Sequence, residues 1–429
     1  MKISLVTTAA LPSLTGTSIN PLLRAAYLSK DHQVELVLPV CVNRHQTGSY
    51  KFWDQEAIAA TSRDYLIQSL PSNAWSPENL SFGFYDALYK PITKSLYPKQ
   101  DIKHYPFRGD TLILEDPIQL LSLPSMLPNP SQMVGPSLKD RYKTVIGINH
   151  TNNFFVLPII FQNPLQLEVV TWGLEFLGSH ILDHQCHLEI NLSAAIPTLH
   201  TVSHTENVNG VHARFFENQS HLASQTPLSD SYFVGKVTPI KRVPVLLEWA
   251  LQEQFKLHIY GKVADVPPGL PQRVQDDFRQ VLERAWEVFN DPNNSVIFHG
   301  ETTQPYVDLA NHKTLVNPSL SEVLCTTTAE ALAMGKFVVM PDHPSNNFFK
   351  RFRNARFYNT DGEAIELIKA LEFAQPEFDP NINELTWESG CDRLLNIINQ
   401  HQDSDPSPMD PPTQTFKMDL PSLALLNRR

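Results

Sequence analysis

Two acidic residues in the carboxy-terminal half of the chain lie beside a predicted helix start, where carboxylates and free backbone amides could bind a polar ligand together. Glu322 and Glu330 are separated by seven residues, in a stretch that reads as a loop followed by a helix beginning near Thr326 and Thr327. An ionised carboxylate accepts hydrogen bonds from two donors at once, as neighbouring sugar hydroxyls require. The free amides at a helix start attract phosphate. These groups together predict a nucleotide-sugar site.

Two lysines supply the positive charge that such a ligand needs. Lys236 and Lys241 follow a predicted strand at 231–235. The diphosphate released when a glycosidic bond breaks is negative. A cation about 4 Å from an oxyanion is worth about 4 kcal/mol at an effective dielectric of about 20, before desolvation costs. Two such cations can replace a divalent metal, and the only Asp-x-Asp, at 403–405, lies in a Pro-rich tail without a preceding strand. The residues therefore give little support for a divalent-metal site.

Each of these groups also has a structural explanation that the sequence leaves open. Thr327 and Glu330 have the spacing of a capping box, which closes a helix start without any ligand. Lysines after a strand are common on protein surfaces, so Lys236 and Lys241 are also consistent with ordinary solvated residues.

The amino-terminal half offers two further candidates. His150 lies in the run Gly147-Ile-Asn-His-Thr-Asn152, at the carboxyl end of a predicted strand, where open α/β sheets bind ligands. An imidazole there is suited to polar catalysis near neutral pH, although a structural histidine is the alternative. Gly16 lies in a loop before a helix predicted at 22–30, where it lets the backbone approach a ligand closely. An ordinary turn is the alternative.

Short apolar strands separated by longer segments predict parallel sheets covered by helices on both faces. The amino-terminal strands are expected at 3–7, 34–38, 111–115, 144–149 and 186–191. A polar linker at 217–230 precedes a second set at 231–235, 256–260, 295–299, 314–317 and 336–340, with helices at 273–289 and 364–373. Gly335 is expected to end the helix that carries Glu330, in a left-handed conformation.

Composition narrows the class of protein. The chain has 429 residues, 42% of them hydrophobic and 18% charged, which suits two globular domains. A net charge of −11 argues against a broad nucleic-acid surface. The four cysteines show no Cys-x-x-Cys spacing, so no zinc site is predicted from them. Met1 leads directly into a strand, so no targeting peptide is expected. The apolar run at 154–161 falls far short of the about 18 residues that a membrane span needs.

Two segments suggest contact with lipid. Residues 89–108 interleave aromatic rings with basic side chains, and such a segment suits an anionic headgroup surface, with a solvated loop as the alternative. Its basic residues are Lys90, Lys94, Lys99, Lys103 and Arg108. The apolar segment 153–177 reads either as a buried helix or as a wall for a lipid acceptor.

Several of these motifs occur together in one family. The two glutamates have the spacing of retaining GT-B glycosyltransferases. The chain also resembles one branch of these enzymes, the digalactosyldiacylglycerol synthases. The resemblance covers the loop at 9–27, the run around His150, and the stretch from the two glutamates through Pro341-Asp-His-Pro-Ser-Asn-Asn-Phe-Phe349. That resemblance implies two doubly wound α/β lobes facing each other across a cleft. The implied parts are an acceptor-side lobe at 1–222, a nucleotide-sugar lobe at 229–375, a helix at 376–400 that crosses back, and a Pro-rich tail at 401–429.

The resemblance also implies a reaction and a role for each candidate residue. The reaction moves an α-galactosyl group from UDP-galactose to monogalactosyldiacylglycerol, with retention of configuration and no metal cofactor. Glu330 would hold the ribose of UDP and Glu322 the galactose. The remaining implied roles are diphosphate binding by Lys236, Lys241 and the amides near Thr326 and Thr327, donor approach at Gly16, and acceptor-side catalysis by His150. The chain departs from the family at Arg242, where a glycine is expected.

The implied location is peripheral, on a plastid envelope or the cytoplasmic face of a photosynthetic bacterial membrane, with anionic lipids and no nucleic acid as partners. Three alternatives remain at this point. The same scaffold could transfer another sugar, such as glucose, to another lipid. It could bind a nucleotide sugar or a lipid without catalysis, or it could act on a soluble sugar.

Overall fold

The computed structural model describes residues 1–43, 54–90, 95–122, 134–151, 164–217, 228–266, 272–320 and 322–403, and the structural statements below concern these residues. They form two compact units. The first is Met1–Gly210 together with the described residues from Thr386 onward, and the second is Val211–Leu385. The boundary between the two units therefore falls after Gly210. The Pro-rich tail beyond residue 403 lies outside the described residues. The lobe limits expected from the sequence stay a prediction.

The first unit is built on a sheet whose described strands run in the order β4-β3-β2-β1-β5-β6-β7-β8. Neighbours are parallel except β3 and β4. The strands are β1 Lys2–Val6, β2 Gln33–Cys41, β3 Leu80–Lys90, β4 Ser95–Pro98, β5 Thr111–Glu115, β6 Thr144–Asn149, β7 Leu188–Asn191 and β8 Ser203–Thr205. The helices are α1 Gly16–Ser29, α2 Gln55–Ser69, α3 Pro117–Leu120, α5 Pro164–Gln185 and α12 Trp387–Asp403, with a 3-10 helix η2 at Ile102–His104.

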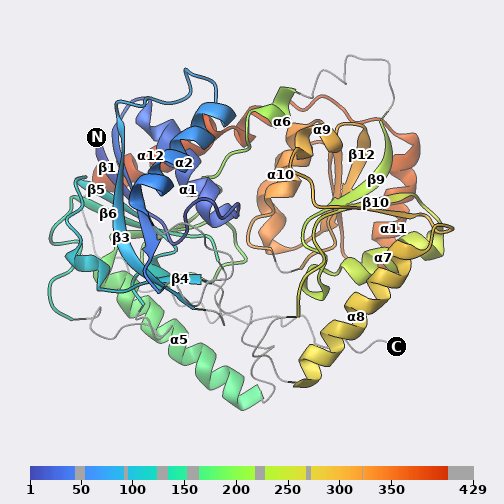
Figure 1. Cartoon of the computed structure of the whole chain (residues 1–429), viewed down its shortest axis with the longest axis horizontal. Helices are drawn as coiled ribbons and strands as arrows, with labels where there is room; N and C mark the ends of the chain where they lie inside the picture. The colour runs from blue at the N-terminus through green and yellow to red at the C-terminus, as the bar shows by residue number, and fades with distance from the viewer. Residues whose placement is uncertain are drawn as a thin grey trace. The chain divides into compact units, whose positions relative to one another are not determined.

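The central strands of this sheet are covered on both faces. Strands β5 and β6 are buried along their whole length, as expected for apolar strands of a parallel sheet between helices. Figure 1 shows α1, α2 and α12 on one side of the strands and α5 on the other. The sequence predicted β5 and β6 at the residues where they occur.

Helix α1 begins six residues earlier than predicted, and Pro21 lies inside it. Proline has no N–H to donate to the carbonyl four residues before it, so the Thr17 carbonyl lacks its usual partner. The Thr7 hydroxyl, directly after β1, donates to that carbonyl at 2.9 Å. This side-chain bond satisfies the carbonyl and attaches the start of α1 to the chain that follows β1.

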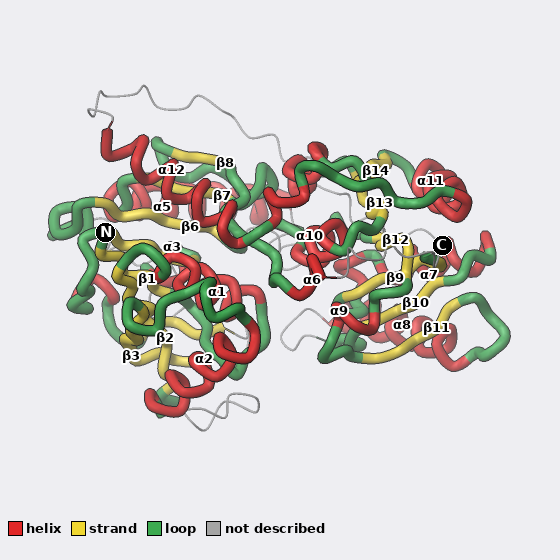
Figure 2. The backbone as a smooth tube through the Cα atoms, turned by 90° about the horizontal axis from the view of Figure 1, so that it is seen from above, coloured by secondary structure: helices red, strands yellow, loops and turns green. Residues whose placement is uncertain are grey.

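The second unit holds an all-parallel sheet whose described strands run in the order β11-β10-β9-β12-β13-β14. The strands are β9 Ser229–Val234, β10 Leu257–Tyr260, β11 Val296–Gly300, β12 His312–Val316, β13 Phe337–Pro341 and β14 Ala355–Tyr358. The helices are α6 Arg214–Glu217, α7 Val243–Glu253, α8 Gln272–Asn290, α9 Pro305–Asp308, α10 Thr326–Ala333 and α11 Asp361–Phe373, with 3-10 helices η5 Pro239–Lys241, η6 Pro344–Arg351 and η7 Ile382–Leu385. Figure 2 traces the strands of each unit as one layer among its helices.

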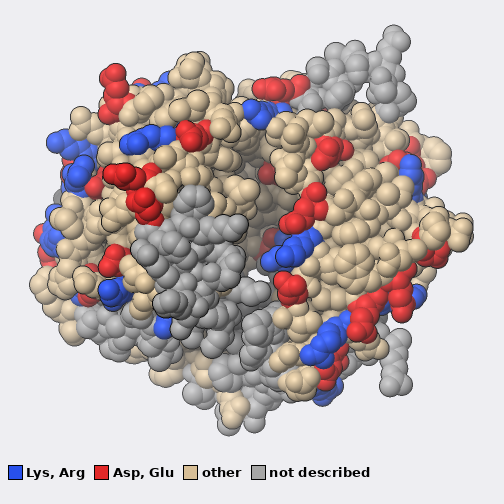
Figure 3. Space-filling view, viewed as in Figure 1, with Lys and Arg blue, Asp and Glu red and all other residues tan. Residues whose placement is uncertain are grey.

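Each face of this second sheet has its own hydrophobic core. Side chains of α7, α8 and α11 pack on one face, around Phe233 and Ile259. Side chains of α10 and η6 pack on the other, around Tyr232 and Leu315. The outer surface of α8 is charged (Figure 3), with Arg284 paired to Glu287 at 2.7 Å. The alternation of buried and charged positions explains why this helix was predicted closely from the sequence.

Two glycines fix the turns beside the candidate site. Gly261, after β10, has φ of +141°, and a Cβ added to it would lie 1.8 Å from the Gly235 carbonyl oxygen. Only glycine permits the ends of β9 and β10 to approach so closely. Gly335 has φ of +71° after α10, which confirms the left-handed helix end that the sequence predicted.

Candidate active site

Lys241 and Glu322 form an ion pair beyond the carboxyl ends of the strands of the second unit. Lys241 ends η5, which follows β9, and Glu322 lies between β12 and α10. Lysine Nζ and glutamate Oε1 are 2.7 Å apart, and the two side chains are 32% and 15% exposed. Burial alone would lower the pKa of Lys241, but the neighbouring Glu322 and Cys325 raise it above its ordinary value. The ammonium is therefore charged at neutral pH and still open to a ligand.

The loop that carries Lys241 also carries the two other basic residues of this region. Lys236 is exposed, one residue beyond Gly235. Arg242 has φ of +54°, a left-handed conformation that favours glycine, which accounts for the glycine expected there from the resemblance. Its guanidinium pairs with Asp361 at 2.9 Å, at the start of α11. Arg242 is therefore anchored to that helix.

Glu330 lies in α10, whose first turn carries Thr326 and Thr327. The capping-box explanation of Glu330 is wrong. The residue before the helix is Cys325, no side-chain cap bond forms, and Thr327 is already within the first turn. Glu330 is half-buried, and burial raises the pKa of its carboxyl to about 8. Because burial makes this carboxyl costly to ionise in the free protein, hydroxyl donors from a ligand would stabilise its ionised form.

In the first unit, His150 is held by two acidic residues rather than standing free. Its ring Nε2 bonds to the Glu115 carboxylate at the end of β5, and its backbone N–H donates to Asp116 Oδ1 at 2.9 Å. The histidine side chain is 5% exposed. Burial alone would lower the pKa of His150, but the charges of Glu115 and Asp116 raise it above its ordinary value. The structure therefore favours an oriented imidazolium.

The same Glu115 carboxylate binds Arg24, a residue that the sequence analysis did not single out. The Nε atom of Arg24 donates to Glu115 Oε1 at 2.8 Å, and this arginine is fully buried in α1. Its other nitrogens donate to the Val208 carbonyl and to Asn209 Oδ1. Burial would raise the pKa of Glu115, but Arg24 and His150 outweigh it and hold that pKa below its ordinary value. An arginine within the apolar run of α1 was the available signal, because a buried charge needs a partner.

Gly16, the other candidate in this unit, is exposed at the start of α1. A Cβ added there would meet only the Asn20 side chain, at an ordinary contact distance of 3.6 Å. Packing within the first unit therefore does not require glycine at this position. Its proposed role in approaching a donor stays a prediction.

The basic segment differs from the expected lipid-facing loop. It forms the antiparallel β3 and β4 pair followed by η2, and its aromatic residues Tyr89, Tyr97 and Phe107 are buried. The lipid-facing prediction is wrong for Lys103, which is 8% exposed and lies beside Asp101.

The other basic residues of this segment keep the prediction open. Lys90 ends β3, Lys99 lies 3.7 Å from Asp86, and Arg108 remains 73% exposed. Lys94 lies outside the described residues.

The apolar segment 153–177 falls partly outside the described residues and partly in α5. Thr171, inside the segment, is buried, and Ile181 and Leu182 are buried farther along the same helix. Trp172 and Phe176 are nevertheless 66% and 44% exposed, and their rings stack at 5.6 Å. Over the ranges that the structure covers, no helix has the length and apolar character needed to cross a bilayer.

Among the residues that the structure describes, Glu322 belongs to no group of three or more side chains that could hold a metal ion. The one cluster of such side chains found in those ranges is Asp230, His258 and His312, at the amino ends of β9, β10 and β12. These residues are far apart in the sequence, so spacing gave no signal of them.

Comparison with known proteins identifies the fold to which the two sheets belong. No protein-family model matches the chain. The lipopolysaccharide outer core galactosyltransferase WaaB superposes with a TM-score of 0.52 at 13% identity, covering 93% of this chain and 99% of its own. An Escherichia coli structure titled trehalose-6-phosphate and bound with UDP-2-fluoro glucose superposes with a TM-score of 0.55 at 12% identity. The match covers 95% of this chain and 100% of that chain. The two sheets and these neighbours define the GT-B glycosyltransferase fold, as the sequence predicted.

Sequence relatives are more specific. Digalactosyldiacylglycerol synthase 2, chloroplastic, of Arabidopsis thaliana is 31% identical over 420 residues, which are 92% of this chain and 81% of the relative. Digalactosyldiacylglycerol synthase 1, chloroplastic, of Glycine max is 30% identical over 436 residues, which are 95% of this chain but 51% of that relative. The chain thus spans about half the length of this second relative. The chain belongs to the digalactosyldiacylglycerol synthase family.

Proposed function

We propose that the chain transfers an α-galactosyl group from UDP-galactose to monogalactosyldiacylglycerol, giving digalactosyldiacylglycerol. The observation that carries the proposal is the pair of Lys241 and Glu322, with 2.7 Å between Nζ and Oε1. In a sugar nucleotide the hexose and the diphosphate are joined through a single oxygen atom. A cation for the diphosphate and a carboxylate for the sugar hydroxyls must therefore be close neighbours, as these two side chains are.

The proposed reaction breaks one bond and forms another at the same carbon. The bond between the galactose anomeric carbon and the diphosphate oxygen breaks, and its electron pair leaves with UDP. A hydroxyl oxygen of the acceptor galactose bonds to that carbon on the same face, and its proton passes to the departing diphosphate. Lys241 stabilises the negative charge that develops on the diphosphate, with Lys236 and the amides near Thr326 and Thr327 beside it.

Glu330 completes the donor site in this proposal. Its carboxyl would accept hydrogen bonds from the ribose hydroxyls of UDP, while Glu322 accepts from the galactose. Structures titled as complexes with UDP-glucose or UDP-2-fluoro glucose occur among the fold neighbours, which supports a UDP sugar as the donor class. No metal is assigned a role, because lysines supply the charge.

The acceptor side of the proposal rests on the first unit. There the imidazolium of His150, oriented by Glu115, would contact the acceptor galactose, and Gly16 would face the donor. The exposed rings of Trp172 and Phe176 on α5 suit insertion among lipid headgroups, as aromatic side chains do at membrane interfaces. Together with the chloroplastic names of the relatives, they support a peripheral position on a photosynthetic membrane rich in anionic lipid.

Thin-layer chromatography of labelled products tests the proposal. The purified chain receives labelled UDP-galactose or UDP-glucose, with mixed micelles containing monogalactosyldiacylglycerol, diacylglycerol or no lipid. We expect one labelled lipid, from UDP-galactose and monogalactosyldiacylglycerol, with the mobility of digalactosyldiacylglycerol and an α linkage by NMR. Initial rates should be unchanged in EDTA. Transfer from UDP-glucose alone, transfer to diacylglycerol instead of monogalactosyldiacylglycerol, or no labelled lipid at all would each overturn it.

A further inference from the structure

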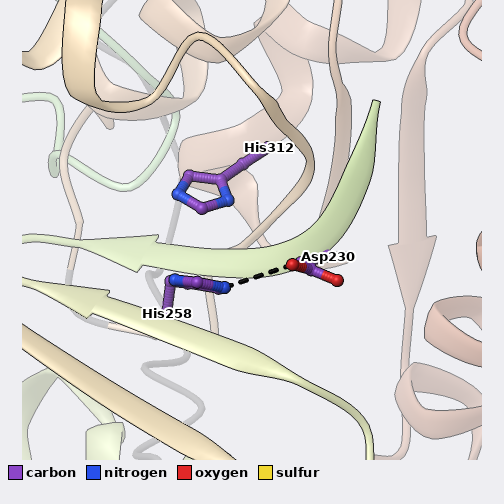
Figure 4. Close-up of side chains that lie close together, drawn as sticks. All are labelled: Asp230, His258 and His312. Atoms are coloured by element: carbon purple, nitrogen blue, oxygen red, sulfur yellow. Dashed lines mark hydrogen bonds and ion pairs between the residues drawn. The ribbon is translucent and has the colours of Figure 1, made fainter. Parts of the chain in front are cut away.

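Three metal-ligating side chains meet at the amino-terminal edge of the second sheet. Asp230 is in β9, His258 in β10 and His312 in β12. β9 lies between β10 and β12 in the sheet, and the rings of His258 and His312 are close, with centroids 4.3 Å apart. Figure 4 shows the three side chains gathered at this edge, with His258 pointing at Asp230.

The separations suit a single ion. One potential ligand atom from each of the three residues lies within 4.8 Å of the others. Asp230 Oδ2 and His258 Nε2 are 3.3 Å apart. Two ligand atoms bound at about 2.1 Å to one tetrahedral ion lie about 3.4 Å from each other, so this pair already has the required spacing. A small closing movement of His312 would complete three of the four positions.

Neighbouring side chains orient the two imidazoles. His299 Nε2 lies 2.9 Å from His258 Nδ1, which directs the other nitrogen of His258 toward Asp230. The Tyr260 hydroxyl lies 2.9 Å from His312 Nε2, which leaves Nδ1 as the nitrogen available to an ion. Such partners on the far ring nitrogen are the usual support of a metal-ligating histidine.

The cluster is accessible, and the cation paired with the Asp230 carboxylate can leave. The side chains of Asp230 and His258 are 24% and 10% exposed. Lys256 Nζ lies 3.0 Å from Asp230 Oδ2, but its side chain is 53% exposed. A divalent ion that binds three ligands would displace this single ammonium, which can turn into solvent.

We propose that Asp230, His258 and His312 bind one transition-metal ion, Zn²⁺ by the chemistry of the donors, and that it joins strands β9, β10 and β12. Two imidazoles and a carboxylate suit Zn²⁺ better than Mg²⁺ or Ca²⁺, which prefer oxygen ligands. Lys236 and Glu322 follow the opposite ends of β9 and β12, about 15 Å away at about 3.3 Å per residue. The ion therefore has a structural role and does not enter the galactosyl transfer.

Metal content and thermal stability of the full chain test this site without any activity measurement. The protein is stripped with a chelator, equilibrated with Zn²⁺ and dialysed. We expect about one Zn²⁺ per chain by mass spectrometry, a higher unfolding temperature with Zn²⁺ than without, and tetrahedral visible absorption bands when Co²⁺ replaces it. Asp230→Asn and His312→Gln should lose the ion and the stabilisation, and His299→Gln should weaken binding about tenfold or more.

His180→Gln is the matched control, because His180 is an exposed histidine on α5 of the first unit. It should retain the ion with unchanged affinity. A wild-type chain that retains no Zn²⁺ overturns the proposal and leaves a hydrogen-bonded histidine cluster only. Equal retention in Asp230→Asn and the wild type also overturns it. Either result leaves the proposed galactosyl transfer untouched, because that is measured by product formation.

Discussion

The two units hold their charged groups in opposite ways. In the first, Arg24, Glu115 and His150 form a network whose side chains are all at most 5% exposed. In the second, Lys241 and Glu322 form a pair with side chains 32% and 15% exposed. In the first network Glu115 is bonded to both Arg24 and His150 within the protein, whereas the second pair can exchange a partner for a ligand. We infer that in this sealed network Arg24 and Glu115 position His150, and that the open pair contacts the donor directly.

The largest expected effect comes from breaking the sealed network. Arg24→Met leaves the Glu115 carboxylate buried without its guanidinium, which should lower the free energy of unfolding by about 3 to 5 kcal/mol. Urea unfolding at neutral pH measures the change. Arg353→Met is the control, because Arg353 and Glu377 form an exposed contact at 4.0 Å, where about 1 kcal/mol or less is expected. Equal losses in the two variants would contradict the contrast.

Breaking the open pair should affect turnover rather than folding. Lys241→Ala removes a cation from the departing diphosphate, so kcat should fall about 100-fold to 1000-fold. Stability should change by about 1 kcal/mol or less, as for other partly exposed pairs. Lys262→Ala, which removes an exposed lysine 4.0 Å from Asp265, should leave kcat unchanged. A Lys241→Ala variant with wild-type kcat would remove this lysine from the mechanism.

The pH dependence of UDP binding tests whether Glu330, in the second unit, contacts the ligand. Glu330 has a pKa of about 8 in the free protein, so it is mainly protonated at pH 7. Ribose hydroxyls that donate to the ionised carboxylate would release its proton, and affinity should rise about fivefold from pH 7 to 8 and level off above. Isothermal titration calorimetry in buffers of different ionisation enthalpy measures both the affinity for UDP and the number of protons released. Glu330→Gln should bind UDP without proton release, and release equal to the wild type would refute the assignment.

The smallest effect is expected at the lipid-facing surface. Replacing Trp172 and Phe176 by serine removes two exposed rings, of which only part would be buried in headgroups. Vesicle affinity should fall about threefold to tenfold, corresponding to about 1 kcal/mol of apolar burial. Co-sedimentation with galactolipid vesicles measures this. Trp286→Ser is the control, since Trp286 is also 44% exposed but lies on α8 of the other unit. An equal loss in both variants would show that any exposed tryptophan suffices.

The sequence predicted those parts of the fold whose signal is local. Strands β5 and β6 are short apolar runs, and Gly335 marks a helix end through its own φ. The β3 and β4 pair was missed because its tyrosines and lysines resemble a surface loop, while in the fold the rings face the core. Membership of the family was predicted from motif residues, and the relatives confirm it.

The groups that sequence reasoning missed depend on long-range pairing. Arg24 and Glu115 are 91 residues apart in the chain, and the contact forms only because α1 packs against the sheet, beside β1 and β2. Asp230, His258 and His312 are brought together by strand order rather than by spacing. For the candidate donor residues the spacing was visible, but the pairing of Lys241 with Glu322 was not.

The return of α12 to the first unit has a practical consequence for dissecting the molecule. Trp387, at the start of α12, is 1% exposed, and its ring stacks on Tyr27 of α1 at 6.3 Å. Residues 211–385 are therefore an uninterrupted insertion between two segments of the other unit. A gene fragment encoding that insertion keeps all the described strands of the second unit. A stop codon before Trp387, in contrast, removes a buried side chain from the core of the first unit.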